Sequence, residues 1–220
     1  MPHGNHLTKP AAGVVAVLLL FYWTLPNHPI DFRSATPGDH QYRGAFHVHS
    51  VESDGGGTVE EIATAARDSN LDFVILTDHG DGTESIPPRY IDDVLILAGV
   101  EISTDGGHYI AVGMPQAPYP LAGDPEGVVD DVRRFGGFGI IAHPYSAREE
   151  LRWQDFTLPV DAIEWINGDS QWRNAGFLSL LSASLHYWFR PVGSLKSILH
   201  RPTDSMYMWD AMASNEAIVA

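Results

Sequence analysis

Short apolar runs that end on a histidine or an acidic residue are the feature that most limits how this chain can fold. Phe73–Leu76 is followed by Asp78 and His79, and Phe138–Ala142 runs directly into His143. Such runs are typical of buried strands, and polar side chains at their ends have no packing reason to be there. Parallel α/β folds place their active sites at the carboxyl ends of strands, so the pattern predicts such a fold with clustered polar side chains.

Predicted helices lie between several of these runs. Thr58 and Glu61 form a capping box that starts a helix reaching about Ser69. Strands that alternate with helices indicate a parallel sheet, either open or closed into a barrel. We predict strands at 45–48, 73–76, 94–100, 109–112, 138–142, 161–166 and 217–220, and helices at 58–69, 123–135, 170–189 and 204–214.

The side chains at the strand ends are those that bind metals. The chain has no cysteine and 11 histidines, so disulfides and thiolate sites are excluded. Histidine and carboxylate ligands suit zinc, manganese or iron. His47 and His49 stand at i and i+2 of a predicted strand, so both imidazoles should face one ion. An isolated pair of this kind can equally be two packed or exposed histidines, so the inference depends on the set as a whole.

The ordered motifs FHVHS, SDG, TDH, GVE, GGH and AHP resemble those of the PHP domain, named after polymerase and histidinol phosphatase. The resemblance runs from about Gly44 to Ala220. It implies an α/β fold, a distorted (β/α)7 TIM-like barrel. It also implies two or three divalent metal ions, usually zinc, manganese or iron, and hydrolysis of phosphate esters.

Carried over position by position, the resemblance implies three metal sites: His47, His49 and Glu101 in the first, Glu101, His108 and His143 in the second, and Asp54 with His79 in the third. Glu101 would bridge two ions and, with Asp78 and Arg148, is expected to be catalytic. Asp78 should orient a ligand, or else is a turn or cap aspartate. Arg148 is the candidate phosphate contact, because a guanidinium grips phosphate with two hydrogen bonds. It can equally be an exposed arginine beside Glu149 and Glu150.

The family pattern continues with a strand and a Gly-x-Asp-x-His segment, which this sequence does not contain. The last residues, Ile218–Ala220, look like that strand. We therefore expect a barrel that is incomplete at its C-terminus, with the first and third metal sites each lacking one ligand. The PHP-type domain is expected to span 44–220.

The N-terminus reads as a segment separate from the fold. Ala11–Leu25 contains 15 residues without a charge, after Lys9. A membrane span needs about 20 apolar residues, so the stretch is short for one. Residues 1–26 are expected to be a signal anchor or a cleaved signal peptide, with a buried or disordered leader as the alternative. A membrane tether through 11–25 or export would follow, and 27–43 would be a linker.

Charge narrows the choice of substrate. The 13 basic and 28 acidic residues give a formal net charge of −15, which repels polyanions, so a long nucleic acid is an unlikely partner. The expected function is hydrolysis of a small phosphorylated substrate by a metal-dependent phosphoesterase. The alternatives are hydrolysis of carbamate or carboxylic esters and a non-catalytic, truncated metal-binding remnant. The sequence makes no prediction of the oligomeric state.

Overall fold

The computed structural model describes residues 13–20 and 41–214. The predicted strand at 217–220 lies outside the described residues, as does most of the predicted linker. The chain divides into two compact units: one combines Met1–Ser34 with Gln171–Arg201, and the other combines Ala35–Ser170 with Pro202–Ala220. We describe each unit by itself.

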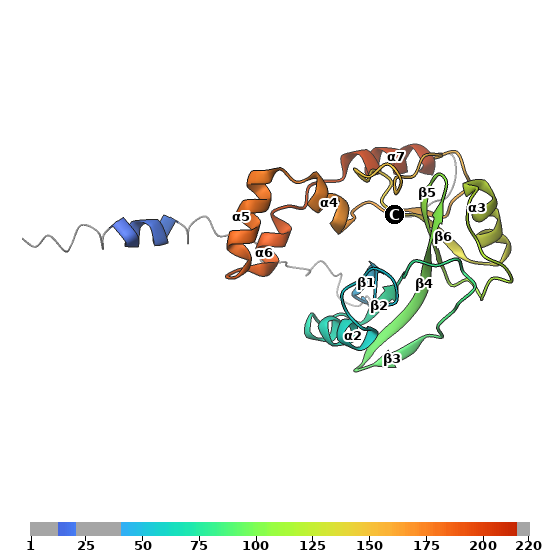
Figure 1. The fold of residues 1–220 in the computed structure, drawn as a ribbon, viewed down its shortest axis with the longest axis horizontal. Helices are drawn as coiled ribbons and strands as arrows, with labels where there is room; N and C mark the ends of the chain where they lie inside the picture. The colour runs from blue at the N-terminus through green and yellow to red at the C-terminus, as the bar shows by residue number, and fades with distance from the viewer. Residues whose placement is uncertain (1–12, 21–40, 215–220) are drawn as a thin grey trace, which may run out of the picture. The chain divides into compact units, whose positions relative to one another are not determined.

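The larger unit is built on one curled sheet (Figure 1). Its strands run in the order β1-β2-β4-β5-β6-β7, and β3 pairs with β4 outside this path. The sheet forms a half-barrel, and no pairing between β7 and β1 closes it within the described part of the chain. The strands are β1 (Gly44–Val48), β2 (Phe73–Leu76), β3 (Arg89–Ile91), β4 (Val94–Thr104), β5 (Gly107–Val112), β6 (Phe138–Ile141) and β7 (Ala162–Ile163).

The sheet is mixed, so the expectation of a parallel sheet was wrong for its centre. β1 with β2, β2 with β4, and β6 with β7 are parallel pairs. β4 and β5 are antiparallel, as are β5 and β6. Only Asp105 and Gly106 separate β4 from β5. A parallel crossover needs about a dozen residues, whereas a connection this short forces a hairpin. Gly107, with φ of +113°, supplies the backbone conformation for that turn.

Two helices cover the sheet where the sequence predicted them. α2 (Val59–Asp68) begins at the capping box of Thr58 and Glu61. α3 (Pro125–Arg134) follows the N-cap Asp124 and buries Val128, Val129 and Val132 in the main hydrophobic core. α7 (Thr203–Ala213) packs against the same core through a tryptophan and two methionines. These helices therefore fix the strands whose ends carry the polar motifs.

The smaller unit contains helices where one long helix was predicted at 170–189. α4 (Gly168–Asn174) leads into it, and α5 (Phe177–Tyr187) and α6 (Pro191–Lys196) follow. Gly176 is the N-cap of α5, and glycine favours a break over a continuous helix at this point.

Residues 13–20 form a short helix, and the remainder of the apolar stretch at 11–25 lies outside the described residues. Within the described ranges, the structure contains no helix with the length and apolar character needed to span a membrane.

Candidate metal centre

The side chain of Glu101 in β4 is surrounded by five histidines. Its exposed fraction is 1%, and each of its carboxylate oxygens faces several imidazole nitrogens. Oε2 lies 3.1 Å from His47 Nε2, 2.9 Å from His49 Nε2 and 3.5 Å from His79 Nδ1. Oε1 lies 2.8 Å from His108 Nδ1 and 2.8 Å from His143 Nε2. The structure thus brings together four parts of the chain: 47–49, His79, the hairpin with Glu101 and His108, and His143.

The sheet itself creates this convergence. His79, three residues after the end of β2, forms a parallel bridge with Glu101, and Gly80 N donates to the Glu101 carbonyl at 3.1 Å. His108 is the second residue of β5, which pairs directly with β4. Glu101 was expected to follow its strand, but β4 continues to Thr104 because these residues pair with β5.

His47 and His143 reach the cluster from unusual backbone conformations. Their φ angles are +59° and +27°, in the region that L-residues rarely adopt. The pairing of β1 shifts register between Ala45 and Val48, so β1 is bulged at His47. The regular i, i+2 strand geometry expected for His47 and His49 is therefore not what directs both imidazoles to Glu101. The bulge re-aims His47.

The distances group the ligands differently from the resemblance. One set whose ligand atoms lie within 4.8 Å of one another contains His47, Glu101 and His143, and a second contains His49, His79 and Glu101. Both sets share Glu101, as a bridging carboxylate would. His108 contacts the other side of that carboxylate at 2.8 Å.

Asp54 lies at the open side of the cluster. Its Oδ1 is 2.6 Å from His49 Nδ1, and its Oδ2 is 3.7 Å from His79 Nε2. Its side chain is 70% exposed, in contrast to Glu101. Asp54 therefore belongs with the second set and could face an incoming substrate.

Asp78 holds the loop that carries Asp54 and does not contact a histidine among the described hydrogen bonds. Its carboxylate accepts from Ser50 N at 2.7 Å, from Ser50 Oγ at 2.8 Å and from Ser53 Oγ at 2.6 Å. Ser50 is completely buried. Asp78 thus positions the segment that follows His49. Its expected role in orienting a metal ligand stays a prediction.

The sequence did not reveal the contacts of Glu164. Its Oε1 lies 3.0 Å from His47 Nδ1, and its Oε2 accepts from the backbone N–H of His143 at 2.6 Å. Asn167 Nδ2 donates to the same carboxylate at 3.3 Å. A carboxylate directly after β7 was the available signal, and the sequence alone does not pair it with His47.

The charges in the cluster shift several pKa values. Burial would lower the pKa of His47, but hydrogen bonds to Glu101 and Glu164 outweigh it and raise the pKa to about 10. Burial would raise the pKa of Glu101, but hydrogen bonds from the surrounding histidines hold it far below its usual range. Burial lowers the pKa of His79 despite the nearby Glu101. The cluster therefore keeps an ionised carboxylate at its centre.

The donor set fits divalent cations. A carboxylate offers about four lone-pair positions, but five ring nitrogens crowd around Glu101. His47 faces a carboxylate oxygen with each ring nitrogen, and a neutral imidazole donates to only one of them, so the other contact requires a proton or a metal cation between the two atoms. Among the described residues, the buried Nδ1 atom of His143 has no hydrogen-bond partner, so the ring is held through Nε2, which faces Glu101.

No family model matches the chain, and no curated protein matches it. Several solved structures, however, match the chain. A two-domain protein from Bacteroides vulgatus that contains a predicted PHP-like metal-dependent phosphoesterase is 21% identical, with a TM-score of 0.38 over 47% of this chain and 35% of that one. A protein from Bifidobacterium adolescentis with a proposed metal-dependent phosphoesterase activity is 14% identical, with a TM-score of 0.45 over 66% of this chain and 84% of that one.

A third neighbour is endonuclease Q, captured with a 27-mer duplex that carries an abasic lesion. It is 15% identical, with a TM-score of 0.42 over 56% of this chain and 42% of that one. The chain spans 35% and 42% of the length of the two larger neighbours. The neighbours are consistent with the PHP resemblance of the sequence motifs. Because every TM-score lies below 0.5, the functional argument depends on the side chains.

A groove of about 790 Å³ adjoins the cluster at His79. Its size suits a small molecule. Its wall also contains Arg89, whose guanidinium lies 3.4 Å from Glu60. The acidic residues that line it are Glu52, Glu60, Asp78, Asp81 and Glu84. The carboxylates of the groove therefore repel an anionic group and allow a neutral or cationic group to bind.

Arg148 does not line this groove. Its guanidinium lies 2.8 Å from Glu150, and its side chain is 48% exposed. A contact between Arg148 and a phosphate stays a prediction.

Proposed function

We propose that this chain is a metal-dependent hydrolase that cleaves a phosphate ester of a small substrate. The observation that carries the proposal is the convergence of five imidazoles on the buried carboxylate of Glu101. Such a set can coordinate metal ions, whereas it cannot serve as a hydrophobic core because burying polar groups is costly. The curled sheet is compatible with part of the distorted (β/α)7 barrel that the motifs imply.

His47, Glu101 and His143 would hold one cation, and His49, His79 and Glu101 would hold another. Bound divalent cations supply Lewis acidity to a phosphoryl oxygen and make water acidic enough to act as a nucleophile near neutral pH. We further propose that His108 holds the second oxygen of Glu101 and that Asp54 completes the open side.

The remaining contacts fix the geometry of these ligands. Glu164 faces Nδ1 of His47, so Nε2 of that ring is left to face the cluster. Asp78 fixes the loop after His49 through three hydrogen bonds. Both carboxylates are themselves held, so the ligands need little reorganisation when a substrate arrives.

The groove beside His79 suggests where the rest of the substrate would lie. The phosphoryl group would face the cluster, and the leaving group would lie in the groove. Its acidic wall favours a neutral or cationic leaving group. It also argues against a long polyanion such as DNA.

The same acidic wall supports a second candidate function, hydrolysis of an uncharged carboxylic or carbamate ester. Arg89 is the only basic residue among those lining the groove, and it pairs with Glu60. Among the described residues of the groove, no unpaired guanidinium therefore faces a phosphate group. An uncharged ester would not need one.

Three esters with one chromophore separate these candidates: p-nitrophenyl phosphate, bis-p-nitrophenyl phosphate and p-nitrophenyl acetate. The chain is stripped with a chelator, reloaded with manganese, zinc or iron, and assayed beside a Glu101→Gln variant. The proposal predicts metal-dependent release from a phosphate ester that the variant loses. Turnover of the acetate alone would favour the second candidate. A duplex with an abasic site is a fourth substrate, for which we expect no cleavage.

A further inference from the structure

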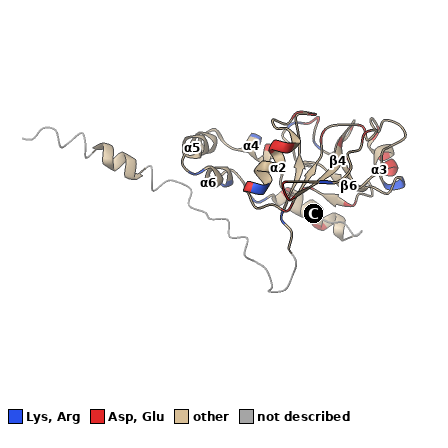
Figure 2. Ribbon diagram, turned by 90° about the horizontal axis from the view of Figure 1, so that it is seen from below, with Lys and Arg blue, Asp and Glu red and all other residues tan. Residues whose placement is uncertain are grey.

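The segment 171–201 differs in charge from the rest of the chain. It contains four basic residues, Arg173, Arg190, Lys196 and Arg201, and no aspartate or glutamate. The whole chain has 28 acidic residues against 13 basic ones. Figure 2 shows no acidic colour on α5 or α6. This segment is therefore a cationic part of a strongly acidic protein.

The hydrophobic side chains of α5 and α6 face outward. Phe177, Leu178 and Trp188 are 77%, 76% and 86% exposed. The residues buried on these two helices are small or polar: Ala183 and His186 on α5, and Gly193 and Ser194 on α6. This is the reverse of a water-soluble helical hairpin, which buries its large apolar residues. Helices that face lipid often pack through small residues in this way.

The polar side chains of the segment bond to nearby backbone. His186 Nδ1 lies 2.7 Å from the Ser182 carbonyl, and Ser194 Oγ donates to the Arg190 carbonyl at 2.8 Å. Ser197 Oγ donates to the Ser194 carbonyl at 2.7 Å. These groups are satisfied within their own helix or turn, so an apolar medium around the helices would leave few of them unpaired.

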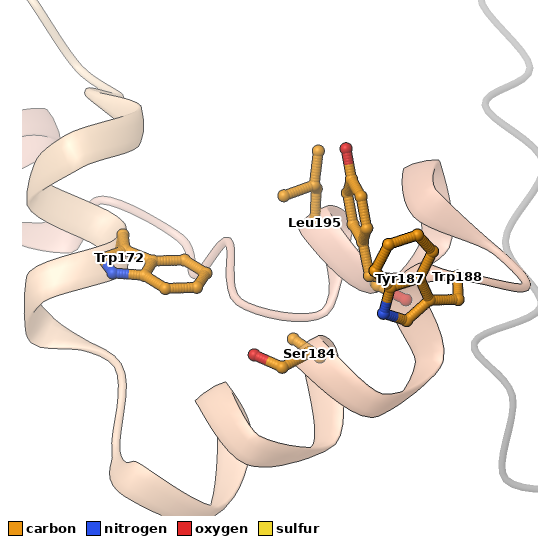
Figure 3. A pocket seen from close by; sticks show the side chains of 7 residues that line it. Trp172, Ser184, Tyr187, Trp188 and Leu195 are labelled. Carbon is orange, nitrogen blue, oxygen red and sulfur yellow. The ribbon is translucent and has the colours of Figure 1, made fainter.

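Aromatic side chains border a cavity of about 340 Å³ between these helices. Trp172, Tyr187, Trp188 and Leu195 line it, with the backbone and side chain of Ser184 at its floor (Figure 3). Tryptophan and tyrosine are enriched where an apolar phase meets water, because one end of each ring is polar.

We propose that the segment 171–201 docks on the surface of an anionic lipid bilayer. The exposed apolar side chains of α5 and α6 enter the acyl boundary, and Lys196 meets the lipid phosphates. With 11 residues, α5 is about 16 Å long, too short to cross a bilayer, so it lies in the interface. A second copy that docks through its own segment 171–201 would bring the same positive charge to this surface, so charge complementarity favours anionic lipid over a symmetric dimer.

Vesicle flotation of the full chain tests this. Vesicles of phosphatidylcholine alone are compared with vesicles that also contain phosphatidylglycerol. We expect the chain to float with the anionic vesicles, more weakly at high salt. Lys196→Gln should weaken binding about fivefold, the loss typical of one basic residue at such a surface. The double variant Phe177→Ser with Leu178→Ser should weaken it at least about tenfold.

A matched pair on the larger unit controls for loss of exposed aromatic residues in general. Tyr90 and Tyr207 are 72% and 69% exposed, so Tyr90→Ser with Tyr207→Ser should bind vesicles as the original chain does. Circular dichroism checks that every variant is folded. Because Phe177 and Leu178 are exposed, their replacement should leave the spectrum unchanged.

A second readout does not depend on flotation. Trp188 fluorescence should shift to the blue with anionic vesicles, and Trp188→Phe should lose that part of the shift. The proposal is overturned if Phe177→Ser with Leu178→Ser floats as well as the original chain, since another segment such as 11–25 would then be the anchor. It is also overturned if the chain ignores the vesicles and light scattering shows that the double variant disrupts a dimer.

Discussion

His47 Nδ1 lies 3.0 Å from Oε1 of Glu164, and this contact determines which nitrogen of the ring faces Glu101. The same carboxylate also accepts from the backbone N–H of His143. One residue outside the ligand set therefore orients two members of it.

Glu164→Gln should weaken metal binding by about 10- to 100-fold, the usual effect of losing a carboxylate behind a histidine ligand. The amide keeps the size of the side chain but loses the charge that orients the imidazole. Titration with manganese or zinc measures the change. Glu126→Gln, at an exposed position in the first turn of α3, is the matched control and should bind as the original chain does. Equal affinity in both variants would show that Glu164 does not support the site.

Glu101→Gln should remove the metal from both sets of ligands, because Glu101 is common to the two. An amide offers only one acceptor oxygen, and its NH₂ group would point at an imidazole or a cation. Elemental analysis of the purified variant checks this. A chain that still carries its full complement of metal would contradict the bridging role.

Asp78→Ala should lower the free energy of unfolding by about 1–3 kcal/mol, the cost of leaving a buried donor unsatisfied. The backbone N–H of the buried Ser50 and two serine hydroxyls would lose their acceptor. Urea denaturation of the metal-free chain isolates this effect from metal binding. An unchanged midpoint would mean that the loop after His49 is held by other contacts.

The strand order could not have been predicted from the apolar runs alone. The run at 94–100 looked complete before Glu101, but residues 101–104 extend β4 because β5 folds back beside them. The pattern of apolar side chains does not indicate that β4 pairs with β5. The two-residue connection at Asp105 and Gly106 does indicate it, because it is too short for a parallel crossover. The capped helix at 58–69 was predictable because Thr58 and Glu61 act locally.

Part of the cluster around Glu101 was predictable because polar side chains follow apolar runs in the sequence, where packing does not explain them. The structure brings His47, His49, His79, His108 and His143 around Glu101, as expected. The roles of Glu164 and of the bulge at His47 were not predictable. The first depends on a contact between residues 117 positions apart, and the second on the pairing of β1 with β2, so local periodicity cannot report either.

The metal-free chain should lose stability as the pH rises from about 6.5 to about 10. The pKa of His47 is raised from its ordinary 6.5 to about 10 in the folded chain, so the folded state holds this proton more tightly than the unfolded state. That contribution is complete below pH 6.5 and disappears as the pH passes the folded value. Urea denaturation of chelator-treated protein across this range measures it. His47→Gln should flatten the slope, and an equally steep slope in this variant would assign the effect to another group.

Metal should stabilise the folded chain by an amount that follows its affinity. With free metal at 100 times the dissociation constant, the free energy of unfolding should rise by about 2.7 kcal/mol. Thermal unfolding with manganese or zinc, before and after a chelator, measures the rise. Glu101→Gln should show no rise. If the original chain showed none either, the imidazole cluster would not be a metal site.

The left-handed backbone at His47 and His143 has a consequence for how this fold could change. Each such residue carries about 1–3 kcal/mol of unfavourable conformation, which glycine would relieve. A chain released from the need to coordinate could therefore become harder to denature by replacing these two histidines with glycine, while losing its chemistry. The two positions thus combine a strained backbone with a place in the histidine cluster, so glycine there would raise stability and remove two imidazoles from Glu101.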